Sequence, residues 1–217
     1  TRRYTGKRHF VNTSKNHLQI KWFFSLVLAN RAKLRLPNKF ILNMTISILT
    51  LFPEMFAGPF AHSIIKRAQE KGKVIINFIN IRDFGIGKHQ EVDDTPYGGG
   101  VGMVLKVDVL HQAIEHAKTL VIPSEVEKSF SAQSPLKKII LMSATGETFN
   151  QKKAESFAAI EHLIIICGHY EGVDERVKAY IDEEVSIGDF ILTGGELPSM
   201  LITDAVVRLL DGVITEG

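Results

Sequence analysis

Short apolar segments alternate with amphipathic ones from Met44 onward. Aliphatic and β-branched residues of this kind are typical of strands buried on both faces of a sheet. The pattern predicts four such strands, at Met44–Phe52, Val74–Ile81, Lys138–Ser143 and His162–Gly168. A shorter strand followed by a loop is predicted at Val185–Leu192.

Helical patterns lie between these strands. Apolar residues at helical spacing, proline at a first turn and glycine after a last turn mark them. The predicted helices run from Pro53 to about Lys71 with Gly72 as C-terminal cap, from Val107 through Ala117, over Gln151–Ala159, near Val173–Tyr180, and over Leu197–Leu210. Strands that alternate with helices predict an α/β fold with a mostly parallel sheet and helices on both faces. The pattern does not give the strand order.

Charge divides the chain in two. Residues 1–43 hold ten of the 26 Lys and Arg and none of the 24 Asp and Glu, so residues 44–217 are acidic. The basic head fits a transit peptide, a nucleic-acid-binding arm, or translated upstream sequence. Because Met44 opens a clean strand, we expect residues 1–43 to lie outside the fold and residues 44–217 to form one domain. Residues 121–136 read as a polar linker.

Composition excludes several classes. The chain is 45% hydrophobic and 23% charged, and its one cysteine, Cys167, cannot form a disulfide within the chain. We therefore expect a protein of the reducing cytoplasm with no membrane span. The histidines show no metal-type spacing with cysteine or with paired carboxylates, so no metal site is predicted.

Glycine-rich segments are the candidates for chemistry. They are Asp93–Met103, Met142–Asn150, Cys167–Val177 and Ser186–Pro198. Open parallel sheets bind ligands at the carboxyl ends of their strands, and four such turns on one edge favour a pocket over simple tight turns. No Walker loop occurs, because the sequence has no Gly-Lys-Ser or Gly-Lys-Thr. The dinucleotide fingerprint also fails, because Met103 stands where its third glycine is required.

Four motifs carry a resemblance to a known family. They are LTLFPEMF (49–56), RDFGIGKHQEVDDTPYGGGVGM (82–103), CGHYEGVDER (167–176) and DEEVSIGDFILTGGELPSMLITDAVVRL (182–209). In this order they resemble the bacterial tRNA (guanine-N1)-methyltransferases. The resemblance covers Met44 to about Val213. It implies methyl transfer from S-adenosylmethionine to N1 of the guanosine 3′ of the anticodon, in a homodimer that binds the tRNA anticodon loop.

The same resemblance implies a fold and a site. The fold would carry a deep C-terminal trefoil knot of the SPOUT class, a rare exception to unthreaded chains. Arg208 and Glu171 are the implied catalytic residues. The implied cofactor pocket comprises Leu141, Met142, Ser143, Gly168, Tyr170, Glu171, Ile187, Gly188, Asp189, Phe190, Ile191, Leu192, Gly194, Gly195 and Pro198. The YGGGVGM loop would serve the neighbouring subunit or the RNA surface.

The chain departs from the family pattern in two ways. Leu141 and Ala144 stand where the family often has tyrosine and proline. Family members also continue into a linker, which carries an aspartate acting as general base, and a helical RNA-binding domain, so we expect this chain to bind the cofactor but to be weakly active or inactive. Two other functions stay open: a non-catalytic nucleoside-binding module, and an oxidoreductase, which the missing fingerprint disfavours.

Overall fold

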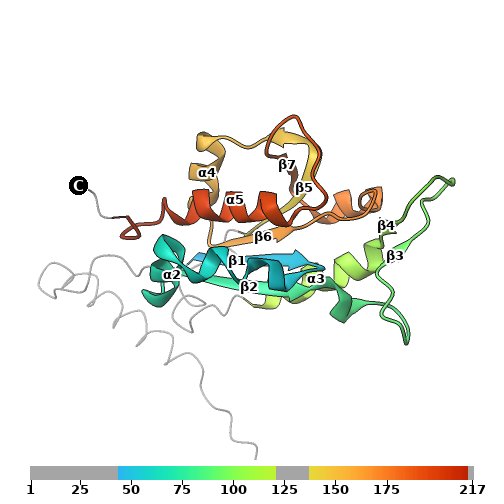
Figure 1. Cartoon of the computed structure of the whole chain (residues 1–217), viewed down its shortest axis with the longest axis horizontal. Coiled ribbons are helices and arrows are strands. Elements are labelled where there is room, and N and C mark those ends of the chain that lie inside the picture. Colours follow the sequence, from blue (N-terminus) through green and yellow to red (C-terminus); the bar gives the residue numbers. More distant parts are fainter. Residues whose placement is uncertain (1–43, 121–136, 215–217) are drawn as a thin grey trace, which may run out of the picture. The chain divides into compact units, whose positions relative to one another are not determined.

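A parallel sheet organises the chain (Figure 1). The structure, a computed structural model, describes residues 44–120 and 137–214. The sheet contains β1 (Met44–Thr50), β2 (Val74–Asn80), β5 (Lys137–Thr148), β6 (His162–Ile166) and β7 (Glu183–Ser186). Its order is β2-β1-β6-β5-β7, and every neighbouring pair is parallel. The expected α/β fold is thus confirmed.

Helices cover both faces of this sheet. They are α2 (Ser63–Glu70), α3 (Val107–Thr119), α4 (Gln151–Ala158) and α5 (Glu196–Val207), with 3-10 turns η1 (Pro53–Phe56), η2 (Pro59–Ala61), η3 (Ile81–Phe84) and η5 (Glu175–Tyr180). One apolar cluster packs α2, α4 and α5 against the sheet, and a second packs α3, η3 and η5 against the opposite face. Alternate residues of β1 and β6 enter the two clusters, as the pleat requires.

The helix predicted from Pro53 to Lys71 was wrong as a single element. Two 3-10 turns replace its first half, and α2 begins only at Ser63. Pro59 explains the break, since proline lacks the N–H that a continuing helix needs. Gly72 does follow the C-terminal end of α2, with a φ of 64°.

Three other segments differ from their prediction. The helix expected near Val173–Tyr180 is the 3-10 turn η5. The glycine-rich loop contains an antiparallel pair, β3 (Asp93–Asp94) and β4 (Val104–Leu105), whose hairpin projects away from the sheet in Figure 1. The third predicted strand, β5, extends to Thr148. The basic head and the linker of residues 121–136 lie outside the described residues.

β5 pairs with β7 twice. Ile140–Met142 lies beside Glu183–Val185, and Glu147–Thr148 lies beside Val185–Ser186, so residues 143–146 leave the ladder between the two pairings. The threading of a trefoil knot through this part of the chain stays a prediction. Within the described ranges, no helix is long and apolar enough to cross a membrane.

A partly buried ion-pair cluster connects α4 with β5 and β7. Lys153 Nζ, with its side chain only 9% exposed, lies 2.8 Å from Glu183 Oε2 and 3.0 Å from Glu147 Oε2. Lys138 Nζ lies 3.0 Å from the other oxygen of Glu183. Burial alone would lower the pKa of Lys153, but hydrogen bonds to Glu183 and Glu147 outweigh burial and hold that pKa above its ordinary value.

His162 makes stability depend on pH. Its ring is fully buried, Nε2 lies 2.9 Å from Ser47 Oγ, and Nδ1 has no hydrogen-bond partner among the residues described. Burial, with a smaller contribution from Lys137, lowers the pKa of His162 from 6.5 to about 4. Between these values the unfolded chain binds the proton and the folded chain does not. Stability is therefore full above pH 6.5 and is lost as the pH falls toward 4.

We expect the His162→Gln variant to lose less stability in acid than the unsubstituted chain. Between pH 7 and pH 5, urea unfolding should show a loss of about 2 kcal/mol that depends on His162. The exposed His89 is the matched control, and His89→Gln should leave that loss unchanged. Equal acid sensitivity with and without His162 would contradict this account.

Candidate functional site

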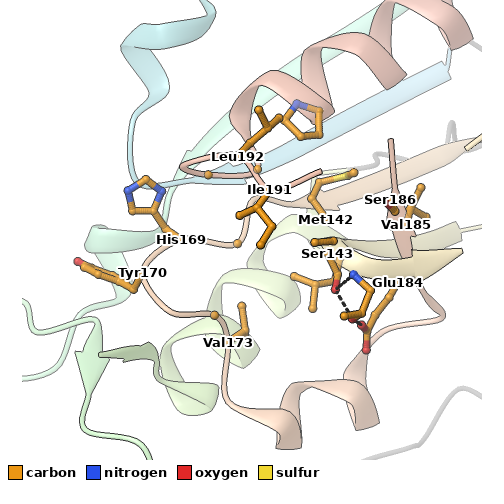
Figure 2. A pocket seen from close by; sticks show the side chains of 18 of the residues that line it. Met142, Ser143, His169, Tyr170, Val173, Glu184, Val185, Ser186, Ile191 and Leu192 are labelled. Atoms are coloured by element: carbon orange, nitrogen blue, oxygen red, sulfur yellow. Dashed lines mark hydrogen bonds between the residues drawn. The ribbon is translucent and has the colours of Figure 1, made fainter. Parts of the chain in front are cut away.

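Residues 143–146, where β5 leaves its pairing with β7, and the turns after β6 and β7 meet at one edge of the sheet and line a cavity of about 460 Å³. Ligand pockets of parallel sheets lie at this edge, and most have volumes of about 300–1,000 Å³. Figure 2 shows Met142 and Ser143 from β5, His169 and Tyr170 from the turn after β6, and Ile191 and Leu192 from the loop after β7 arranged around this space.

The turn after β6 is held from outside by β4. The Glu171 N–H donates to Met103 O, the Leu105 N–H donates to Gly172 O, and the Asp174 N–H donates to Leu105 O, each at 3.1 Å. Tyr170 takes a positive φ of 62°, which an L-residue adopts only under local constraint. The hydrogen bonds to β4 supply that constraint and fix Tyr170 and Glu171 at the cavity rim.

The excursion of β5 forms a polar corner. Ser143 Oγ and Thr145 Oγ1 lie 3.0 Å apart, and Thr145 Oγ1 donates to Glu184 Oε2 at 3.5 Å (Figure 2). Lys178 Nζ bridges Glu184 at 3.0 Å and Glu175 at 2.7 Å. This corner presents hydroxyl and carboxylate oxygens, which suit the hydroxyl groups of a bound ligand.

The loop after β7 forms the third wall. The Gly195 N–H donates to Gly168 O at 2.8 Å and thereby ties the start of α5 to the turn after β6. A Cβ at Gly195 would lie 2.7 Å from Cys167 Cα and 2.8 Å from Gly168 N, so any larger residue there must move backbone. Ile187, Leu192 and Pro198 add apolar surface to this wall. A flat apolar ring could bind against it.

Most of the predicted pocket residues line this one cavity. Those that do are Leu141, Met142, Ser143, Gly168, Tyr170, Glu171, Ile187, Phe190, Ile191, Leu192, Gly194, Gly195 and Pro198. Gly188 and Asp189 belong to the same loop but are not among the lining residues. Leu141 and Ala144, the two departures from the family pattern, both line it.

Arg208 lies elsewhere in the chain. It is exposed and follows the last residue of α5, whereas the cavity contacts the beginning of that helix at Gly195 and Pro198. Ten residues of α-helix span about 15 Å. Arg208 is not among the residues that line the cavity of its own chain.

The segment Asp93–Met103 was expected at the same edge as the other three glycine-rich segments, and it does not line the cavity. It forms the projecting hairpin instead. Gly102, with a φ of 92°, packs against the Glu171 side chain from behind, where a Cβ would overlap Glu171 Cγ. The hairpin thus supports the cavity rim without entering the cavity.

Sequence reasoning missed several lining residues. They are His169, Thr145, Gly172, Val173, Glu175, Val177, Lys178, Glu184, Val185, Ser186 and Thr193. Glu184 lies on β7 and Lys178 on η5, which precedes β7. Both line the cavity because β7 pairs with β5, and that pairing is a matter of strand order. His169 had a visible signal, since it lies inside a turn already singled out.

Charged groups near the turn after β6 divide by role. The hydrogen bond from Arg176 holds the pKa of the Asp174 carboxyl below its ordinary value, and Asp174 also caps η5 by accepting from the Arg176 N–H at 2.9 Å. That pair is structural.

The Cys167 thiol is fully buried. Its burial raises its pKa, and the nearby charge of Glu196 raises it further. Among the described residues, no three His, Cys, Asp or Glu side chains are grouped to hold a metal ion.

Known proteins share these segments. A model of the family described as tRNA (Guanine-1)-methyltransferase TrmD matches residues 44–217. A tRNA (guanine-N(1)-)-methyltransferase of Carboxydothermus hydrogenoformans is 55% identical over 172 residues, which are 79% of this chain and 62% of that protein. Its counterpart in Syntrophomonas wolfei is 53% identical over 171 residues, 79% of this chain and 64% of that protein.

A solved structure agrees with these relatives. The crystal structure of tRNA (m1G37) methyltransferase from Aquifex aeolicus superposes with a TM-score of 0.66 at 38% identity, and the match covers 80% of this chain and 73% of that one. The chain spans somewhat less than two thirds of the length of the curated relatives named above. By its sequence, its parallel sheet and its cavity-forming turns, the chain belongs to the tRNA (guanine-1)-methyltransferase family.

Proposed function

We propose that the chain binds S-adenosylmethionine in the cavity at the ends of β5, β6 and β7 and serves methyl transfer to N1 of the guanosine 3′ of the anticodon in tRNA. The observation that carries the proposal is the convergence of three family-matching turns on one cavity. We infer a cytoplasmic location, which agrees with a tRNA substrate and with a chain that holds one cysteine. When bound, S-adenosylmethionine supplies an activated methyl group.

The cavity lining fits the parts of this cofactor. Leu141, Ile187 and Leu192 offer apolar surface for the adenine. Backbone N–H groups of the neighbouring turns can donate to its ring nitrogens, and backbone carbonyls can accept from its amino group. Ser143 and Thr145 offer hydroxyl groups to the ribose. Gly188 and Asp189 belong to the proposed pocket through the loop that carries Ile187.

Glu171 is proposed as a catalytic residue at the cavity rim. Its side chain is exposed, and its position is set by the backbone bond to Met103 and by contact with Gly102. A carboxylate there stabilises positive charge inside the cavity. Glu171 thus favours a cationic methyl donor over a neutral nucleoside.

Arg208 is proposed to act in the cavity of a second copy of the chain. It is about 15 Å along α5 from its own cavity. Exposed apolar side chains occupy the loop after β7 and the outer side of α5: Phe190, Ile191 (87% exposed), Leu197 and Leu201. Such a surface favours a protein–protein interface, so we propose a homodimer.

The guanidinium of Arg208 suits guanine. Its planar fork can donate two hydrogen bonds toward guanine O6 and so stabilise negative charge on the base as the ring proton leaves. The target base must leave its stack to reach a cavity of this size, which costs less in a single-stranded loop than in a duplex. This agrees with a site in the anticodon loop.

Isothermal titration of the chain with S-adenosylmethionine, S-adenosylhomocysteine and NADH tests the proposal. We expect both sulfur compounds to bind and NADH not to bind. At 100 times its Kd, S-adenosylhomocysteine should stabilise the fold by about 2.7 kcal/mol. Binding of NADH alone would overturn the proposal. Cofactor binding without methyl transfer in any form of the protein that carries these residues would indicate a binding module.

A further inference from the structure

Glu196 is a buried carboxylate beside the cavity that the proposed reaction does not use. It is the first residue of α5, only 2% exposed, and it does not line the cavity. Glutamate is rarely this buried without a partner, because moving a charge out of water is costly. The contacts of its two carboxylate oxygens therefore indicate its role.

One oxygen of Glu196 is bound to the end of β1. Thr50 Oγ1 donates to Glu196 Oε1 at 2.8 Å, and the same hydroxyl accepts the Phe52 N–H at 3.0 Å. Thr50 is fully buried. The position of Glu196 in the first turn of α5 is also favourable for a negative charge. The carboxylate is thus fixed between a sheet strand and a helix terminus.

The other oxygen faces His169. Glu196 Oε2 lies 3.8 Å from His169 Nδ1, and Nδ1 is buried with no hydrogen-bond partner in the described part of the chain. The imidazole is held between Phe52, at a ring distance of 5.0 Å, and Tyr170, at 5.5 Å. In the tautomer that carries a proton on Nδ1, a small side-chain rotation would complete a hydrogen bond to Glu196.

Gly194 packs against both members of this pair. A Cβ at Gly194 would overlap Glu196 Oε2 and lie 2.5 Å from His169 Nδ1. Gly194 and His169 both line the cavity, on the wall after β7 and the wall after β6 respectively. The Glu196–His169 pair therefore lies at the junction of two cavity walls, with His169 in the lining and Glu196 behind it.

We infer that Glu196 and His169 are positioning residues of the cofactor cavity. After a small rotation of the His169 side chain, the Glu196 carboxylate, fixed by Thr50, accepts the His169 Nδ1–H and holds the turn of residues 168–170 against Gly194 and Gly195. The inference rests on the proposed function, since it needs the cavity to bind S-adenosylmethionine. Neither residue exchanges a proton with substrate in this role.

The test is a double-mutant cycle on Glu196→Gln and His169→Gln, with the Kd of S-adenosylhomocysteine and the Tm of the free chain as readouts. Glu196→Gln keeps an acceptor for Thr50 and removes the charge that faces His169. Each single variant should weaken binding about tenfold, the scale of one hydrogen bond to a charged group. The double variant should be no weaker than either single variant, because the two substitutions remove one shared interaction.

Glu183→Gln is the matched control. Glu183 is a partly buried glutamate in the ion-pair cluster with Lys138 and Lys153, outside the cavity lining. This variant should lower the Tm and leave the Kd unchanged. Thr50→Ser, which keeps the hydroxyl, should bind like the unsubstituted chain, and Thr50→Val should resemble Glu196→Gln. If Glu196→Gln fails to fold, His169→Gln and Thr50→Val carry the same comparison.

The outcomes separate the two proposals. If the unsubstituted chain does not bind S-adenosylhomocysteine, the proposed function fails and this inference fails with it. If it binds, but the Glu196 and His169 variants change only the Tm, the pair is structural and the positioning role is overturned. Additive losses in the double variant would show two independent effects and would also overturn the pair.

Discussion

Replacement of Gly195 by alanine is expected to weaken S-adenosylhomocysteine binding by about 10- to 100-fold. The new Cβ would lie 2.7 Å from Cys167 Cα and 2.8 Å from Gly168 N, and both are backbone atoms that no rotamer change can move. Overpacking of this kind costs about 1–3 kcal/mol. The strain is relieved only by moving the start of α5 away from the turn after β6, which opens two cavity walls. Isothermal titration measures the loss.

Gly58→Ala provides the matched control for this variant. Gly58 has an ordinary φ of −74°, and nothing lies within 4 Å of a Cβ built on it. The Gly58 variant should therefore keep both the Kd and the Tm of the unsubstituted chain. Unchanged binding by Gly195→Ala, in a chain whose fold is intact, would show that the cavity walls do not contact the ligand.

Replacement of Arg208 by alanine is expected to reduce kcat for methyl transfer by about 10²–10³-fold, the usual effect of removing one charged donor from a developing anion. The Kd of S-adenosylhomocysteine should not change, because Arg208 lies at the far end of α5 from its own cavity. Arg208→Lys should recover little, since lysine lacks the planar fork. The assay needs a form of the protein that methylates tRNA at a measurable rate. Arg67→Ala, an exposed arginine on α2, is the control.

A mixing experiment shows which chain supplies Arg208. At a cofactor concentration well below the raised Kd of Gly195→Ala, Arg208→Ala and Gly195→Ala chains are each expected to be nearly inactive alone. When they are unfolded and refolded together, half of the dimers pair an intact cavity on one chain with an intact Arg208 on the other. Activity should then return to about a quarter of the unsubstituted level. No recovery in verified mixed dimers would mean that Arg208 does not act across the interface.

The sequence predicted where the strands lie along the chain better than it predicted which strands lie side by side. Apolar runs located β1, β2 and β6 within a few residues, because buried parallel strands leave a continuous hydrophobic signal. The helix from Pro53 failed because Pro59 and its neighbours break it into short turns. The second half of β5 was missed because residues 144–148 are small or polar and are recruited by pairing with β7. That pairing lies about 40 residues away in sequence and leaves no periodic signal.

In the candidate site, too, the residues of distinctive motifs were predicted and the residues placed by strand order were not. Resemblance located Tyr170, Glu171 and Gly195, which lie in distinctive turns, and these residues do surround one cavity. It gave no indication of Glu184 or Lys178, whose places depend on strand order, nor of Glu196, which is buried behind the cavity. The available signal for Glu196 was an acid at the start of a mostly apolar helix, but an acid at that position is equally typical of an exposed helix end.

A crystal structure of the chain grown with saturating S-adenosylhomocysteine tests the central claim most directly. We predict electron density for the ligand between Ser143, Tyr170 and Leu192, with its adenine against the apolar wall and its ribose near Thr145. Density at another surface would contradict this account of the three converging turns, as would a cavity left empty while titration shows binding.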